Sequence, residues 1–197
     1  MEEKIIEGLE ILWNIFVLSL LVITFSLLII SIVPSFLACI SVVRQLKEKK
    51  VSNLDINVIA FWGNFKSYFW KGVIVQLFGA VVLVVAYINF QLIIQSNNSI
   101  EKFIVITVTI TFLIITLMFL LNLMYGITIK HVNVKLLEHN LLLVFAKLPI
   151  VLLLSLCYLL FFVTAFLLPQ VLILTVGLLI LIHYKTGSKI WEQFDQV

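Results

Sequence analysis

Charged residues are scarce in this chain of 197 residues: they make up 12% of it, whereas 63% of the residues are hydrophobic. Soluble domains usually carry about 25% charged and roughly 45–50% apolar residues. A soluble body of this size could not bury so much apolar surface, and the mean hydropathy of +1.22 leads to the same conclusion. These proportions exclude a cytosolic globular enzyme, a secreted disulfide domain and a disordered chain. They predict that a lipid bilayer surrounds most of the chain.

Cysteine and arginine are also rare. Cys39 and Cys157 lie apart in apolar surroundings, and the sequence contains no CxxC motif and no Cys/His cluster, so neither a disulfide framework nor a metal site is predicted. Arg44 accompanies twelve lysines, and the net charge of +3 is too small for a nucleic-acid-binding surface. His131 and His139 are eight residues apart, which is not the spacing of a helical zinc pair. We therefore expect no metal, no cofactor and no nucleic-acid partner.

Long apolar runs predict an all-α bundle of five transmembrane helices in a single membrane domain covering residues 1–197. A span needs about 20 mostly apolar residues. The predicted spans cover about residues 11–33, 72–94, 103–129, 148–168 and 170–184. Pro169 separates the last two, because proline lacks an amide hydrogen and disfavours helix in the residue before it. The fifth run is short, which leaves open a tilted helix, a re-entrant helix and one that extends toward the C-terminus.

The distribution of lysine and arginine predicts the orientation, because short cytoplasmic loops carry an excess of both. Six basic residues lie in the loop 44–71, three in the loop 130–147 and two in the tail after 184, whereas the loop 95–102 carries Lys102 alone. With the N-terminus outside and the C-terminus in the cytoplasm, eleven basic residues face the cytoplasm and two face outside. We expect a multi-pass protein of the cell membrane with this topology.

The predicted spans contain no Asp, Glu, Lys or Arg. Ion-coupled transporters, pumps and voltage sensors place ionisable groups inside the membrane. Intramembrane enzymes need a nucleophile with its base, or metal ligands, at the same depth. His183 alone lies near a span, at its end, where we expect it at the membrane interface. We therefore predict that the protein is not an enzyme, and we assign no catalytic residue.

Small and amide residues in the spans predict helix packing. Gly72, Gly79 and Ala86 recur every seven residues, and such a stripe lets another helix approach closely, either inside the chain or from a partner. Gln76 and Asn122 fall at a similar depth in the second and third spans. Because an unpaired amide in lipid costs several kcal/mol, we predict a hydrogen bond between these two side chains.

The loop after the first span contains an aromatic-rich helix, predicted over about residues 55–70. Asn53 or Asp55 can cap its first turn. One side of the helix carries apolar residues at helical spacing: Ile59, Trp62, Phe65, Phe69 and Trp70. Such a helix lies in the lipid headgroup region or docks a partner protein. The candidate partner-binding residues are Trp62, Phe65, Lys66, Phe69, Trp70 and the preceding Arg44.

Three blocks of the sequence carry a family resemblance. Residues 32–38, followed by 42–44, form a proline-containing turn; residues 60–71 form the aromatic helix; and residues 140–149 run from an asparagine to a Lys-Leu-Pro sequence. Together they resemble the YesL-like family of bacterial integral membrane proteins, a domain of unknown function found mainly in Gram-positive bacteria. Val33 departs from the family, which commonly has Gly before the proline. The resemblance covers nearly the whole chain.

The resemblance implies a five-span protein without assigned enzymatic activity. Many family members are encoded beside carbohydrate ABC importers, which suggests an accessory role in sugar uptake. The leading hypothesis is therefore a non-enzymatic protein that binds the permease subunits of such an importer and acts in its assembly, stability or regulation. The alternative is a stand-alone carrier of small solutes or lipids without ion coupling. Its polar cavity would be formed by Gln76, Thr107, Thr111, Asn122 and Tyr158.

Overall fold

The computed structural model describes residues 2–26, 29–49, 54–95, 98–129, 134–167 and 172–191. These residues form seven α-helices and one short 3-10 helix and contain no strand. The elements are α1 (Glu2–Ser26), η1 (Ile29–Ser31), α2 (Ile32–Lys49), α3 (Leu54–Gln95), α4 (Ser99–Ile129), α5 (Val134–Ala146), α6 (Leu148–Leu167) and α7 (Leu172–Trp191). The expected all-α class is confirmed over this part of the chain.

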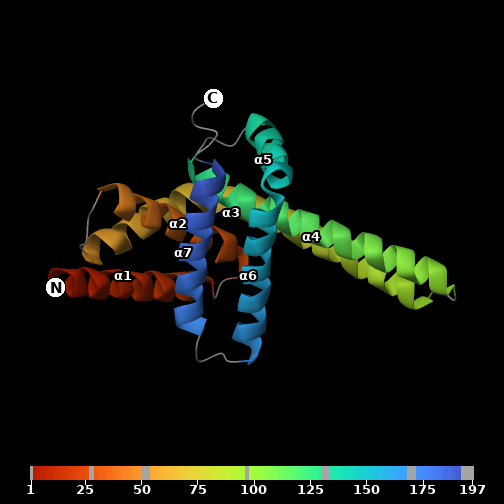
Figure 1. Ribbon diagram of the computed structural model, residues 1–197, viewed down its shortest axis with the longest axis horizontal. Coiled ribbons are helices and arrows are strands. Elements are labelled where there is room, and N and C mark those ends of the chain that lie inside the picture. Colours follow the sequence, from red (N-terminus) through yellow and green to blue (C-terminus); the bar gives the residue numbers. More distant parts are fainter. Residues whose placement is uncertain are drawn as a thin grey trace.

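The helices form a bundle with one projecting arm. α6 and α7 lie side by side, and α1 crosses α7 at a steep angle (Figure 1). α2 packs against α3 and α7. α3 and α4 pair with each other, and their far ends extend away from the other helices as an arm (Figure 1). α5 lies at the end of the bundle where α6 begins.

The apolar run 11–33 does not form one helix. α1 ends at Ser26, and α2 begins after the short 3-10 helix η1. Ser31 Oγ donates to the carbonyl of Phe25 and so closes the connection between the two helices. Pro34 lies in the first turn of α2, where a proline is tolerated because its missing N–H would have no intrahelical partner there. The predicted first span is therefore divided between two helices.

The predicted interfacial helix 55–70 and the predicted span 72–94 are one continuous helix. α3 has 42 residues, which corresponds to a length of about 63 Å at ~1.5 Å per residue. The hydrocarbon core of a bilayer is only about 30 Å thick. α3 is thus long enough to pack on the bundle with its first half and to cross a membrane with its second half.

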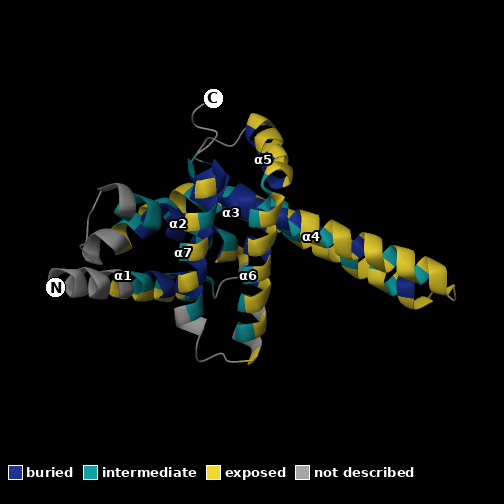
Figure 2. Cartoon of the chain, viewed as in Figure 1, coloured by how far each residue is buried: buried dark blue, intermediate teal, exposed yellow. Residues whose placement is uncertain are grey.

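Two of the described helices are long and apolar enough to cross a membrane: Val58–Gln95 within α3 and Ser99–Ile129. The pair Lys135–Ala146 and Leu148–Phe161, which is bent by 94°, would be a third if it counts as one span. Most residues of the α3–α4 arm are exposed, and many of them are large and apolar (Figure 2). A helix that is hydrophobic all round belongs in a bilayer or in a protein core. The length and the apolar composition of these helices support the expectation that the chain is a membrane protein.

The core is centred on the C-terminal part of α4. Every residue of the segment 121–128 is buried, because α2, α5, α6 and α7 all pack around it. Two glycines allow the closest of these contacts. A Cβ atom on Gly126 would lie 2.5 Å from Cζ2 of Trp191, and one on Gly187 would lie 2.4 Å from Cδ2 of Tyr125. α7 reaches this core because it continues to Trp191, seven residues beyond the end of the predicted fifth run.

Candidate functional site

The first half of α3 has two different faces. One face is buried and carries Phe61 and Phe65. The other is exposed and carries Ile59, Trp62, Lys66 and Trp70, which we call the aromatic surface. Trp62 is 45% exposed and Trp70 is 73% exposed. These four residues follow one another at three- and four-residue intervals, so they share one side of the helix.

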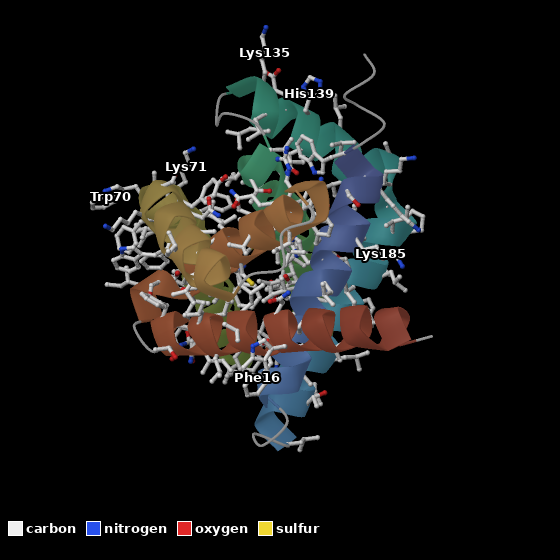
Figure 3. The ribbon with its side chains drawn as sticks, turned by 90° about the vertical axis from the view of Figure 1, so that its left-hand side faces the viewer. Phe16, Trp70, Lys71, Lys135, His139 and Lys185 are labelled. Atoms are coloured by element: carbon white, nitrogen blue, oxygen red, sulfur yellow. The ribbon has the colours of Figure 1, made fainter. Side chains whose placement is uncertain are left out.

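Contacts within the chain hold the aromatic surface in place. The ring of Trp62 stacks on Phe65, with centroids 5.8 Å apart and an interplanar angle of 9°. The Lys66 ammonium lies 4.9 Å from the centroid of the Trp62 ring, within the range of a cation–π interaction. Trp70 lies at the edge of the molecule, with Lys71 close by (Figure 3). The surface therefore combines large rings with positive charge.

Phe65 and Phe69, two of the predicted partner-binding residues, belong largely to the interior. Phe65 is buried and its ring lies 4.9 Å from that of Phe25 in α1. Phe69 is half-buried and contacts Phe65 edge-on, with ring centroids 5.6 Å apart. Helical spacing had grouped them with Trp62 and Trp70. Because both sides of this helix are apolar, spacing alone did not distinguish the buried face from the exposed one.

Arg44 also has an internal role. Its Nη1 donates to the carbonyl oxygen of Thr128 at 3.1 Å, and Tyr68 Oη donates to the same oxygen at 3.4 Å. Thr128 lies in the last turn of α4, whose carbonyls lack intrahelical partners. A cation at a helix C-terminus is favourable because of the helix dipole. Arg44 therefore ties α2 to the end of α4.

The predicted stripe of small residues on α3 faces the chain itself. A Cβ atom on Gly72 would lie 2.7 Å from the backbone nitrogen of Pro34, so the two helices touch backbone to backbone there. A Cβ atom on Gly79 would lie 3.4 Å from Leu120 in α4. Ala86 is half-buried on the arm. At Gly72 and Gly79 the neighbour is thus a helix of the same chain.

The predicted hydrogen bond between Gln76 and Asn122 is not formed. Gln76 Oε1 accepts from the backbone N–H of Val33 at 3.3 Å and so satisfies one donor in the first turn of α2. Asn122 bonds instead to Asn140 and Trp191. The reason is the position of α5, which packs on the end of α4 and brings a second buried amide to Asn122.

Asn122, Asn140 and Trp191 form a buried polar network that joins α4, α5 and α7. Asn122 Nδ2 donates to Asn140 Oδ1 at 2.8 Å, and Asn140 Nδ2 donates to the carbonyl of Phe119 at 2.9 Å. Trp191 Nε1 donates to Asn122 Oδ1 at 3.1 Å. Sequence reasoning missed Asn140 and Trp191 as partners. The available signal was a lone asparagine in the apolar segment 140–146.

A second buried pair joins α6 and α7. Tyr158 Oη lies 2.6 Å from Nδ1 of His183, and both side chains are buried. His183 was expected at the membrane interface; its side chain is buried inside the chain, and its depth in a membrane stays a prediction. Its Nε2 atom has no hydrogen-bond partner among the described residues. Among all the residues that the structure describes, no group of three or more His, Cys, Asp or Glu side chains could hold a metal ion.

A cavity of about 840 Å³ lies between the arm and the bundle. Residues of α1, α2, α3, α4, α6 and α7 line it, and nearly all of them are apolar. Of the residues predicted to line a polar cavity, it includes Gln76 and Tyr158. Thr107 and Thr111 are exposed on α4, where each donates to a carbonyl one turn earlier, at 2.8 Å. The polar cavity of the carrier hypothesis is therefore not assembled.

Residues 8–90 match the model of a family described as "Protein of unknown function, DUF624". The match covers most of α1, all of α2 and nearly all of α3, and so includes the aromatic surface and the contact between Gly72 and Pro34. YesL-like proteins belong to this family, which confirms the resemblance over these residues. No curated protein and no solved structure shows significant similarity to the chain.

Proposed function

We propose, from the match of residues 8–90 to the DUF624 family model and from the resemblance to YesL-like proteins, that this chain is a non-enzymatic accessory protein of a carbohydrate ABC importer. It binds the permease subunits in the membrane and acts in their assembly, stability or regulation. The importer as partner follows from the family resemblance. The observation that carries a binding role is the aromatic surface of α3, with Trp62 45% and Trp70 73% exposed.

The composition of the aromatic surface supports contact with a protein. Tryptophans dominate the binding energy of many protein interfaces when they enter a pocket of the partner. Trp62 is held by Phe65 behind it and by Lys66 beside it. Fixing a side chain before binding lowers the entropy that binding costs. A helix face seated in a groove of the partner is a frequent recognition mode.

We further propose a multi-pass arrangement in the cell membrane, with five spans, the N-terminus outside and the C-terminus in the cytoplasm. The two helices of spanning length support the multi-pass arrangement, whereas the number of five spans and the orientation are proposed from the apolar runs and basic residues of the sequence. Lys71 and Lys135 both lie in the upper half of the view in Figure 3, which agrees with the gathering of basic residues on the cytoplasmic side. The aromatic surface would then face the permease from the cytoplasmic membrane interface.

The double variant Trp62→Ala/Trp70→Ala tests the binding surface. We expect the amount of importer permease that co-purifies with the tagged chain in mild detergent to fall at least about tenfold, since a single interface tryptophan often contributes 2 kcal/mol or more. Trp13→Ala is the matched control, because Trp13 is also exposed but lies on α1. Equal permease recovery with the double variant and the wild type would contradict the proposed surface.

A further inference from the structure

The cavity between the arm and the bundle has the properties of a lipid site, and we propose that it binds the acyl chains of one membrane phospholipid. This inference does not depend on the importer. It rests on the size of the cavity, on the chemistry of its wall, on its opening and on an unpaired hydroxyl group. Each of these is a property of the described residues.

The size and wall of the cavity fit a long hydrocarbon chain. Its volume of about 840 Å³ lies within the range of roughly 300–1,000 Å³ that is typical of small-molecule sites. The wall is formed by aliphatic and aromatic side chains, among them Val75, Leu113, Leu117, Leu121 and Phe161. Water is stable in a cavity only where two to four polar partners surround it, so most of this volume offers water no binding site.

The cavity opens toward the surface that a bilayer would cover. Ala80 and Leu83 line it from α3, and both are exposed, with Leu83 at 65%. They belong to the helix segment that is long and apolar enough to cross a membrane. An empty apolar cavity destabilises a protein in proportion to its volume, and the apolar material available at this opening is lipid. An acyl chain can thus enter sideways from the membrane.

Ser26 supplies a polar group on this apolar wall. Ser19 and Thr24 of the same helix donate to carbonyls one turn earlier, at 2.7 and 2.8 Å. Ser26 is one of the residues that line the cavity, and its Oγ atom is buried beside it without a hydrogen-bond partner among the described residues. A buried hydroxyl without a partner is unfavourable. The ester carbonyl at the head of an acyl chain is an acceptor that this hydroxyl can use.

Filling the cavity tests the proposal. The chain is reconstituted in vesicles of dioleoylphosphatidylglycerol, extracted in mild detergent and analysed by native mass spectrometry. We expect the wild type to retain one phosphatidylglycerol per chain and Ala80→Phe to retain it at least about tenfold less, because the loss of burial for about two methylene groups weakens binding tenfold. Val84→Phe is the matched control, since Val84 lies one turn further along α3, is 57% exposed and is not part of the lining.

A second variant that fills the cavity keeps the test decisive if the first one misfolds. Leu113→Phe fills the cavity from α4, and its lipid retention decides the outcome if Ala80→Phe does not fold. Retention of the lipid by both filled variants at the wild-type level would overturn the proposal. The proposal would also be overturned if the wild-type chain carried no stoichiometric lipid, or if Val84→Phe lost as much lipid as Ala80→Phe.

The hydroxyl of Ser26 gives a chemical test of the same site. Removal of one hydrogen bond in Ser26→Ala should lower the retention of the ester lipid roughly fivefold. The ether analogue lacks the carbonyl and offers only the weaker ether oxygen as an acceptor, so Ser26→Ala should lower its retention less than that of the ester lipid. An equal loss of ester and ether lipids in Ser26→Ala would contradict the assigned hydrogen bond.

Discussion

Replacing Gly72 with alanine is expected to lower the free energy of unfolding by about 1–3 kcal/mol, the usual cost of overpacking a tight contact. The new Cβ atom would lie 2.7–2.8 Å from the nitrogen, Cα and Cδ atoms of Pro34. A proline ring and a backbone cannot move aside as a flexible side chain can, so α2 and α3 must separate. The measurement is reversible unfolding in mixed micelles of dodecyl maltoside and sodium dodecyl sulfate.

Gly63→Ala is the matched control on the same helix. A Cβ atom on Gly63 has no neighbouring atom within 4 Å. Alanine is a better helix former than glycine by up to about 1 kcal/mol, so this variant should be unchanged or slightly more stable. If Gly72→Ala were as stable as Gly63→Ala, the close contact between α2 and α3 would be wrong.

Replacing Asn122 with leucine is expected to destabilise the chain by about 2–5 kcal/mol. Asn122 accepts the indole N–H of Trp191 and donates to Asn140 Oδ1. Its removal leaves two buried polar groups without these partners, and each such group costs about 1–3 kcal/mol. Thr111→Val is the matched control on α4: Thr111 is exposed, and surface substitutions usually change stability by less than about 0.5 kcal/mol.

A double-mutant cycle measures the interaction between Asn122 and Trp191 separately from the effect of each single substitution. Trp191→Phe removes the indole N–H but keeps an aromatic ring beside Gly126. Because Asn122 and Trp191 share one hydrogen bond, the loss in the double variant should be smaller than the sum of the two single losses. Strictly additive losses would show that the two side chains do not interact.

The helical class and most apolar runs could be predicted from the sequence, because a bilayer imposes a minimum length on each span. The division between α1 and α2 was missed. The run 11–33 is uniformly apolar, so hydropathy does not mark a break within it. The local signals were Ser31 and Pro34. The Ser31 hydroxyl donates to a carbonyl near the end of α1, and the Pro34 ring lies in the first turn of α2.

The candidate site was predicted only in part. Of the candidate partner-binding residues, Trp62, Lys66 and Trp70 are exposed, whereas Phe65 is buried; whether they bind a partner stays a prediction. Periodicity separates an apolar face from a polar one, but in α3 the buried and the exposed faces are both apolar. The partners of Asn122 are 18 and 69 residues away in sequence. Spacing within one helix carries no information about such distant contacts.

The most direct test of the central proposal is photo-crosslinking in the native membrane from position 62. A photoreactive phenylalanine analogue replaces Trp62 in one strain and Trp13 in another, and the adducts are identified by mass spectrometry. We expect adducts with a carbohydrate importer permease from position 62 and none from position 13. Adducts with lipid alone at position 62, or equal permease adducts from both positions, would contradict it.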